Sequence, residues 1–361
     1  MTNKKQALRH FPRPYALFVL ALTLMTLACW VYLWNGLSAY EKGVPHNVMS
    51  GLVASLQNEI ETTGNCSSLL RKYGPGIPGS DAEIDGVIFA EAIRGQKVDF
   101  HKKINPDEPT KTNYELNAGN RVVANVELHV KKKGIFGLEL YGIKSVYGDK
   151  KVTISAVPGV QVYVEGKLLA EDAQTQEEFI PKDLRELAGF SKSTIKIPQF
   201  DTYELLGLFH IPYIAGYDEK GNISDAVFVR DDHAVVGLPM PEELQKEMEE
   251  RAATITKKYS YYMSDNLVWG GFRSYIVKNA PVYDRLRTLE VYWYTLHDST
   301  RFENMEMSDW VMYSDKLLSL RVVYDFIVVG QGKVTTYPTD LTYYLAQEAD
   351  GVWRIAEMIV N

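Results

Sequence analysis

The chain has 361 residues, of which 46% are hydrophobic and 24% are charged, and its formal net charge is −7 at pH 7. This length predicts two or three domains, and a composition close to that of globular proteins excludes a largely disordered chain. The four basic residues before residue 15 contribute +4, so the remainder carries −11, which argues against nucleic-acid binding because phosphates require a basic surface.

The first predicted element is a transmembrane helix over residues 15–37. This segment has no charged residue, and at about 1.5 Å per residue it is roughly 34 Å long, enough to cross the hydrocarbon core of a bilayer. Because basic residues precede it and acidic residues follow it, we expect residues 1–14 to form a cytoplasmic tail and the chain beyond about residue 40 to be extracytoplasmic. The basic residues are Lys4, Lys5, Arg9 and Arg13.

Two alternatives to a retained anchor are a cleaved signal peptide and an acylated lipoprotein. The apolar run is longer than that of most signal peptides, and Trp30 and Trp34 near its end suit the membrane interface. A lipoprotein would be acylated at Cys29, but Thr26 stands where such sites prefer Leu, and the apolar run continues past the cysteine. We therefore expect the helix to be retained.

Cysteine usage favours a bacterial surface protein. The two cysteines are Cys29 and Cys66, and the first lies inside the predicted span, so no disulfide can form within the rest of the chain. Secreted animal domains usually contain disulfides, whereas bacterial surface proteins often lack them. The sequence therefore predicts a protein of the bacterial cell envelope.

Residues 46–148 are predicted to form an α+β domain. Apolar residues spaced four apart mark one face of a helix, and a Gly- and Pro-rich stretch then separates it from a second short helix that ends near residue 93. Alternation between Val122 and Val130 predicts a half-buried strand with a hairpin partner at 138–148. The helical face consists of Val48, Leu52, Leu56 and Ile60.

A basic cluster, Lys131–Lys133, occupies the predicted turn of this hairpin, and Lys102 and Lys103 lie elsewhere in the domain. The cluster is either a solvated hairpin tip or a site for an anionic polymer. The first interpretation is favoured, because a run of like charges is usually a solvated surface.

Residues 149–240 are predicted to form a small β-sandwich module. Val160, Val162 and Val164 alternate with polar residues, and Glu165-Gly166 supplies a hairpin turn. Further short strands extend to about Leu238, with a short helix near 181–190 as an insertion.

Residues 241–361 are predicted to form a second α+β domain. It opens with the most amphipathic helix of the chain, at 241–262, where Glu242 and Glu243 are favourable in the first turn. Two short helices are expected around 272–277 and 282–289. The expected strands lie near 290–297, 305–313, 316–329, 335–347 and 352–359.

The final strand reads “DGVWRIAEM”, with Gly351, Trp353, Ile355 and Met358, and “LTYYLAQ” precedes it. Together with one long and two short helices, this pattern resembles the nuclear-transport-factor and ketosteroid-isomerase-like cone fold. The resemblance implies helices packed across a strongly bent antiparallel sheet, and residues 46–148 look like a shorter version of the same cone. It implies no function, because one fold hosts many functions.

The segment “VPGVQVYVEGKLL” resembles small β-modules with a Pro-Glu-Gly-Ala core on bacterial surfaces, although Val164-Glu165-Gly166-Lys167 keeps only the Glu-Gly. The order of span, β-module and terminal cone is similar to the ectodomains of teicoplanin-resistance-associated membrane proteins of Gram-positive bacteria. The zinc ribbon that those proteins often carry is not expected here, since residues 1–14 contain no cysteine.

A cone enzyme needs an acid and a base in an apolar cavity, where burial shifts their pKa values toward the working pH. Asp325 shares the polar face of its strand with Arg321, which favours a surface ion pair, and the neighbours His297 and Asp298 would point to opposite faces. The candidates are Asp284, His297, Asp309 and Asp325, with Tyr275, Tyr283, Tyr292 and Tyr294 as hydroxyl donors.

The sequence has no HxxxH, CxxC, Gly-rich phosphate loop or Gly-x-Ser-x-Gly motif, so we expect no catalytic residue, no metal and no cofactor. An aromatic cluster is the remaining candidate for a ligand site, because aromatic pockets bind sugars and apolar ligands. Core packing is the favoured role, since helices across a bent sheet need bulky side chains. The cluster contains Tyr259, Tyr262, Trp269, Phe272 and Tyr275.

We therefore expect a non-catalytic, membrane-tethered protein whose extracytoplasmic domains bind an envelope protein or a cell-wall polymer. One alternative is a scaffold subunit of a conjugation or secretion channel, since some such subunits combine one N-terminal span with tandem cones, although they need no intervening β-module. A second alternative is a small-molecule enzyme in the C-terminal cone, which a cone filled by side chains would exclude.

Overall fold

The computed structural model describes residues 13–104, 111–134, 137–170, 174–179, 184–185, 187, 195–289 and 297–361. The chain divides into two compact units, Met1–Gly76 with Ser80–Asp149 and Ile77–Gly79 with Lys150–Asn361. Helices and several sheets are both present, so the predicted mixed α and β content is confirmed. The expected domain boundary at 240/241 lies inside the second unit.

The first helix, α1, covers Arg13–Gly43 and is one continuous helix beyond the predicted end of the span at residue 37. Tyr15–Gly43 is long and apolar enough to cross a membrane. The hydroxyls of Thr23 and Thr26 donate to the carbonyl oxygens of Val19 and Leu22 at 2.8 Å, so these polar groups are satisfied within the helix.

Three helices follow in the first unit, α2 (Pro45–Thr63), α3 (Ser67–Tyr73) and α4 (Ala82–Ile93). The Asp81 carboxylate caps α4 by accepting from the backbone N–H groups of Glu83 and Ile84 at 2.8 and 3.3 Å. Helix α3 was not predicted, because its seven residues are too few for a periodic pattern and glycines follow at once.

The first unit continues with β1 (Val98–Lys103), β2 (Thr112–Ala118), β3 (Arg121–Lys133) and β4 (Glu139–Tyr147), an antiparallel sheet in the order β1-β2-β3-β4. Ala124, Val126 and Leu128 are buried as predicted, but Val122 is half-buried and Val130 is exposed. The register between β2 and β3 shifts at Leu116/Asn117, which disrupts the alternation at that end, and the other end of β3 extends beyond the core.

The second unit begins with two sheets, in the orders β11-β10-β6-β7 and β12-β13-β5-β9-β8. Glu165 and Gly166 have φ values of 49° and 71°, as the predicted two-residue hairpin turn requires. The helix expected at 181–190 lies mostly outside the described residues. The strands are β5 (Lys150–Ala156), β6 (Gln161–Val164), β7 (Lys167–Leu168), β8 (Gln174–Phe179), β9 (Phe200–Leu208), β10 (Ile214–Tyr217), β11 (Ile223–Asp225), β12 (Val227–Arg230) and β13 (His233–Val236).

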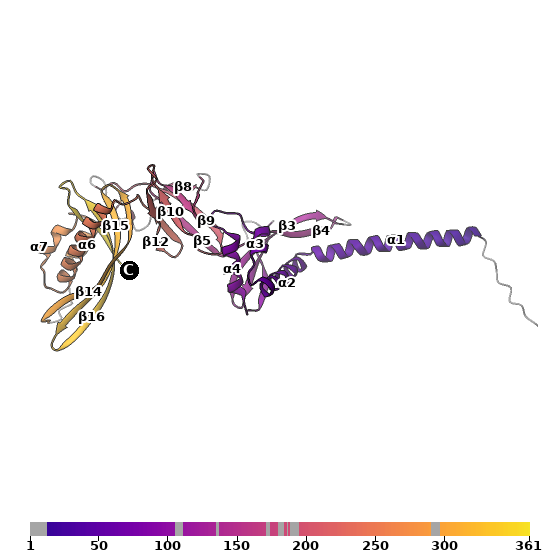
Figure 1. Ribbon diagram of the computed structural model, residues 1–361, viewed down its shortest axis with the longest axis horizontal. Helices are drawn as coiled ribbons and strands as arrows, with labels where there is room; N and C mark the ends of the chain where they lie inside the picture. Colours follow the sequence, from indigo (N-terminus) through magenta and orange to yellow (C-terminus); the bar gives the residue numbers. More distant parts are fainter. Residues whose placement is uncertain are drawn as a thin grey trace, which may run out of the picture. The chain divides into compact units, whose positions relative to one another are not determined.

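The C-terminal part contains helices followed by a curved antiparallel sheet in the order β14-β15-β16-β17 (Figure 1). Helices α6 and α7 lie on one side of this sheet (Figure 1). The strand expected at 290–297 lies almost entirely outside the described residues. The elements are α6 (Glu242–Met263), α7 (Trp269–Phe272), the 3₁₀ turn η3 (Arg273–Tyr275), α8 (Pro281–Arg287), β14 (Ser299–Ser314), β15 (Leu317–Gly330), β16 (Lys333–Gln347) and β17 (Trp353–Val360).

The β-module and the C-terminal sheet share one hydrophobic core. The Leu238 N–H donates to the Met312 carbonyl at 2.7 Å, and the rings of Phe200 and Tyr313 lie 6.0 Å apart. A Cβ at Gly237 would lie 2.8 Å from the Met312 carbonyl oxygen, so the close approach of the two chains requires glycine. These contacts explain why residues 150–361 form one unit.

Candidate functional site

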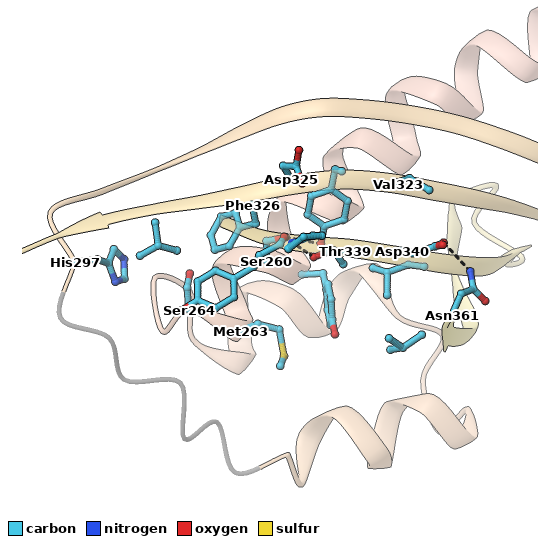
Figure 2. Close-up of a pocket in the computed structure, with 17 residues that line it drawn as sticks. Ser260, Met263, Ser264, His297, Val323, Asp325, Phe326, Thr339, Asp340 and Asn361 are labelled. Atoms are coloured by element: carbon cyan, nitrogen blue, oxygen red, sulfur yellow. Dashed lines mark hydrogen bonds between the residues drawn. The ribbon is translucent and has the colours of Figure 1, made fainter. Parts of the chain in front are cut away.

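A cavity of about 460 Å³ lies between the C-terminal half of α6 and the far ends of β15 and β16 (Figure 2). His297 is at one end of this cavity and Asn361 at the other (Figure 2). Its volume is within the range of pockets that bind small molecules. The walls are mainly apolar and include Met263, Phe326, Val328, Pro338 and Leu341.

The cavity exists because strands β15 and β16 extend beyond the end of helix α6. Alternate residues of β15, from Leu318 to Phe326, are buried on one face as predicted, and α6 packs over them through a stripe that ends at Tyr262. Helix α6 is about 33 Å long, at 1.5 Å per residue, whereas β15 extends over about 45 Å. The sheet near Phe326 and Val328 therefore extends beyond the last turn of α6, and both side chains remain largely buried, at 7% and 5% exposure.

Neutral hydroxyl groups form the floor of the cavity where α6 meets the sheet. The Ser260 hydroxyl lies 2.8 Å from the Tyr324 hydroxyl, and one turn earlier the Thr256 hydroxyl donates to Tyr343 at 3.3 Å. Burial and the neighbouring Tyr324 raise the pKa of Tyr259 to about 12, and burial also raises the pKa of Tyr324. These phenols are therefore protonated near pH 7 and act as hydrogen-bonding groups.

Charged groups near the cavity are held in local pairs. Arg321 donates to both carboxylate oxygens of Asp340, at 2.9 and 2.6 Å, and this lowers the pKa of Asp340. The expected ion pair between Asp325 and Arg321 is wrong, because Arg321 pairs with Asp340 and with Asp309 at 3.5 Å. Asp325 instead accepts from the Asn304 side chain at 2.7 Å.

The acid and base candidates do not converge on one point. Asp284 pairs with Arg287 at 3.3 Å on the exposed face of α8, and the Nε2 atom of His297 lies 3.0 Å from Asn266 Oδ1. The candidate hydroxyl donors Tyr275 and Tyr283 pack against Arg251 and Trp269, at 4.9 and 5.0 Å respectively. Tyr292 and Tyr294 lie outside the described residues.

The aromatic cluster packs mainly between α6, α7 and α8. Phe272 is fully buried and stacks on Tyr262 at 5.4 Å, and the Tyr262 hydroxyl donates to the Leu286 carbonyl at 2.9 Å. Trp269 also packs against this group, with its ring centroid 5.7 Å from that of Tyr262. Of the five residues proposed from the sequence, Tyr259 lines the cavity.

Several cavity residues were not proposed from the sequence. They include Ser260 and Met263 on α6, Tyr324 and Phe326 on β15, and Tyr337 on β16. The alternation along β15 already placed Tyr324 and Phe326 on the inner face, so the signal was present for these two. The end of α6 relative to the strands is a tertiary relationship that no local pattern encodes.

No protein-family model and no characterised protein matches the sequence. Among solved structures, the chain is similar to an Ntf2-like protein involved in plasmid conjugation, with a TM-score of 0.22 and 12% sequence identity. The match covers 74% of this chain and 79% of that chain.

Proposed function

We propose that this chain is a membrane-tethered, non-catalytic scaffold of the bacterial cell envelope, and that its C-terminal cavity binds an apolar segment of a protein partner. The apolar helix α1 supports tethering, and the basic residues before it support an extracytoplasmic position for the rest. The observation that carries the binding proposal is the cavity, whose apolar walls lie over a floor of neutral hydroxyls.

The cavity favours a protein partner over a cell-wall polymer. Half-buried Met263 and exposed Val360 offer apolar surface in the cavity, and covering such surface stabilises a complex by about 25 cal/mol per Å². A phosphate-containing polymer would need cationic walls, and the nearby cation Arg321 is already engaged by Asp340 and Asp309. Binding is also favoured over acid–base catalysis, because the candidate groups Asp284, Asp309 and His297 are held by separate neighbours and do not converge on one point.

Site-specific photo-crosslinking in intact cells tests this function. A crosslinking residue at Val360, which lines the cavity and is 68% exposed, should capture one envelope protein. The same residue at exposed Lys257 on α6 serves as the control position and should not capture it. Ser264→Trp, which fills the cavity from its rim, should abolish the Val360 crosslink; capture that persists in this variant contradicts the proposal.

A scaffold in a conjugation or secretion channel is a second candidate, and the repetition of architecture favours it. Helices followed by a four-stranded antiparallel sheet occur both at α2–β4 and at α6–β17, after a single apolar helix. A channel subunit should form a ring when the full chain is extracted in mild detergent, and a gene for a coupling ATPase should lie beside its own. A monomer without such a neighbour favours the first candidate.

A further inference from the structure

The β3–β4 hairpin ends in a basic cluster that the proposed function does not explain. Lys131, Lys132 and Lys133 are exposed at the end of β3, and none of them forms an ion pair with another described residue. The nearby acids have other partners. Glu115 pairs with Lys103 at 2.9 Å, and Glu127 pairs with Lys144 at 2.9 Å. Glu139 lies opposite Lys133 in the register, but it forms no ion pair with Lys133 and accepts from the Tyr141 hydroxyl at 2.8 Å.

The three consecutive lysines form a local concentration of positive charge in a chain whose net charge is −7. Their mutual repulsion is unfavourable in the isolated protein, so an anionic surface outside the chain would stabilise them. Their position beside α1 in the first unit indicates that this anionic surface is the membrane.

The turn end of this hairpin packs against the end of α1. Leu140 on β4 is buried against Gly43, where an added Cβ would lie 2.8 Å from Leu140 Cδ2. Lys132 is directly opposite Leu140 in the register, and opposite residues of an antiparallel pair point to the same face. The hairpin projects toward the side on which α1 continues to its N-terminus (Figure 1).

Distances along the axis of α1 place the lysines near the membrane surface. The apolar run ends at Leu37, about 9 Å before Gly43 along the helix axis. Lys132 is level with Leu140 and therefore with Gly43. From there, one further strand residue of about 3.3 Å and an extended lysine side chain together span a distance similar to that between Gly43 and Leu37. The headgroup layer is roughly 5–8 Å thick on each side of the hydrocarbon core, so the ammonium groups reach it.

We propose that Lys131–Lys133 form a contact surface for the anionic phospholipid headgroups of the leaflet in which α1 ends. The hairpin is then a second attachment that holds the first unit against the bilayer and fixes its orientation. This inference rests on the part of the proposed function in which α1 spans a membrane. Each lysine near an anionic surface strengthens the attachment about fivefold, or roughly 100-fold for three.

Lysine acylation of the full chain in lipid nanodiscs provides the test. The acylation rates of Lys131–Lys133 should fall about fivefold when phosphatidylcholine is partly replaced by phosphatidylglycerol. Exposed Lys257, Lys278 and Lys316 of the second unit are internal controls and should react equally in both lipids. The difference should disappear at high salt, when the Debye length falls from about 10 Å to about 3 Å.

A variant series separates the contact from general charge effects. In K131Q/K132Q/K133Q, amide exchange around Leu140 in phosphatidylglycerol should rise to its rate in phosphatidylcholine, whereas K257Q/K278Q/K316Q should leave it unchanged. Lysine rates that are equal in both lipids overturn the inference. Rates that fall only when soluble poly(glycerol phosphate) is added also overturn it, and would assign the cluster to a wall polymer. A chain that does not enter nanodiscs contradicts the proposed function instead.

Discussion

The Ser260 hydroxyl lies 2.8 Å from the Tyr324 hydroxyl, and this pair joins α6 to the inner face of β15 at the floor of the cavity. Both residues are buried, at 3% and 2% exposure, so neither hydroxyl can exchange its partner for bulk water at low cost. The pair therefore fixes the height of α6 over the sheet. Beyond it, the helix ends and the cavity opens.

The first prediction concerns the strength of this hydrogen bond. Ser260→Ala and Tyr324→Phe should each lower the free energy of unfolding by about 1 kcal/mol, because each leaves a buried hydroxyl without this partner. The double variant should lose less than the sum of the two, with a coupling of about 1 kcal/mol. Urea unfolding in detergent, followed by tryptophan fluorescence, measures these differences; strictly additive losses would mean that the bond contributes nothing.

A second prediction concerns a buried carboxylate at the other end of the C-terminal domain. Glu357 on β17 is 3% exposed and pairs with Arg285 on α8, and its Oε1 atom also accepts from the Met358 N–H at 2.7 Å. Arg285→Met should destabilise the protein by about 2 kcal/mol, less than a fully buried pair because Arg285 is half-exposed. Replacing both residues, Arg285→Met with Glu357→Leu, should restore much of the loss in the same unfolding experiment.

Local periodicity was sufficient to predict the elements that form the walls of the cavity. Met248, Ala252 and Ile255 of α6 are all fully buried, as are Leu318 and Leu320 of β15, since burial on one face repeats with the period of each element. Helix α3 was missed because it is shorter than the window in which a period can be recognised. Most of the expected first strand of the terminal sheet falls outside the described residues.

The interactions around the cavity could not be predicted in the same way. Arg321 and Asp340 are brought together by the pairing of β15 with β16, in which Arg321 faces Thr342 and Asp340 lies diagonally across. A one-residue change of register would separate them, and no local pattern specifies that register. The sequence placed Arg321 and Asp325 on one face correctly, but the partner of Arg321 came from the neighbouring strand.

A third prediction follows from the turn before β17. Arg354 donates to both carboxylate oxygens of Asp350, and this lowers the pKa of Asp350 to about 2 from an ordinary value of 3.8. A lowered pKa favours the folded state only where the carboxylate is ionised in the unfolded chain, so the contribution is full above pH 4 and is lost as the pH falls toward 2. Asp350→Asn should lower Tm at pH 7 and leave it unchanged near pH 2. A Tm difference that is independent of pH contradicts this assignment.

The last prediction tests whether the β-module and the C-terminal sheet unfold as one unit. A Cβ at Gly237 would lie 2.8 and 2.9 Å from backbone atoms of Met312, and backbone cannot yield as a flexible side chain can. Gly237→Ala should therefore break the hydrogen bond from Leu238 to Met312 and uncouple the two parts. Limited proteolysis should then cut near residue 240, between β13 and α6.

Gly270→Ala provides the matched control, because nothing lies within 4 Å of its added Cβ. Alanine there should be neutral or slightly stabilising, by up to about 1 kcal/mol, since it lowers the entropy of the unfolded chain. If Gly237→Ala resists proteolysis as well as Gly270→Ala does, the shared core alone holds the two parts together. The close approach at Met312 would then be a consequence of that packing. The β-module and the C-terminal domain would unfold together, and the boundary expected at 240/241 would not separate two units that unfold independently.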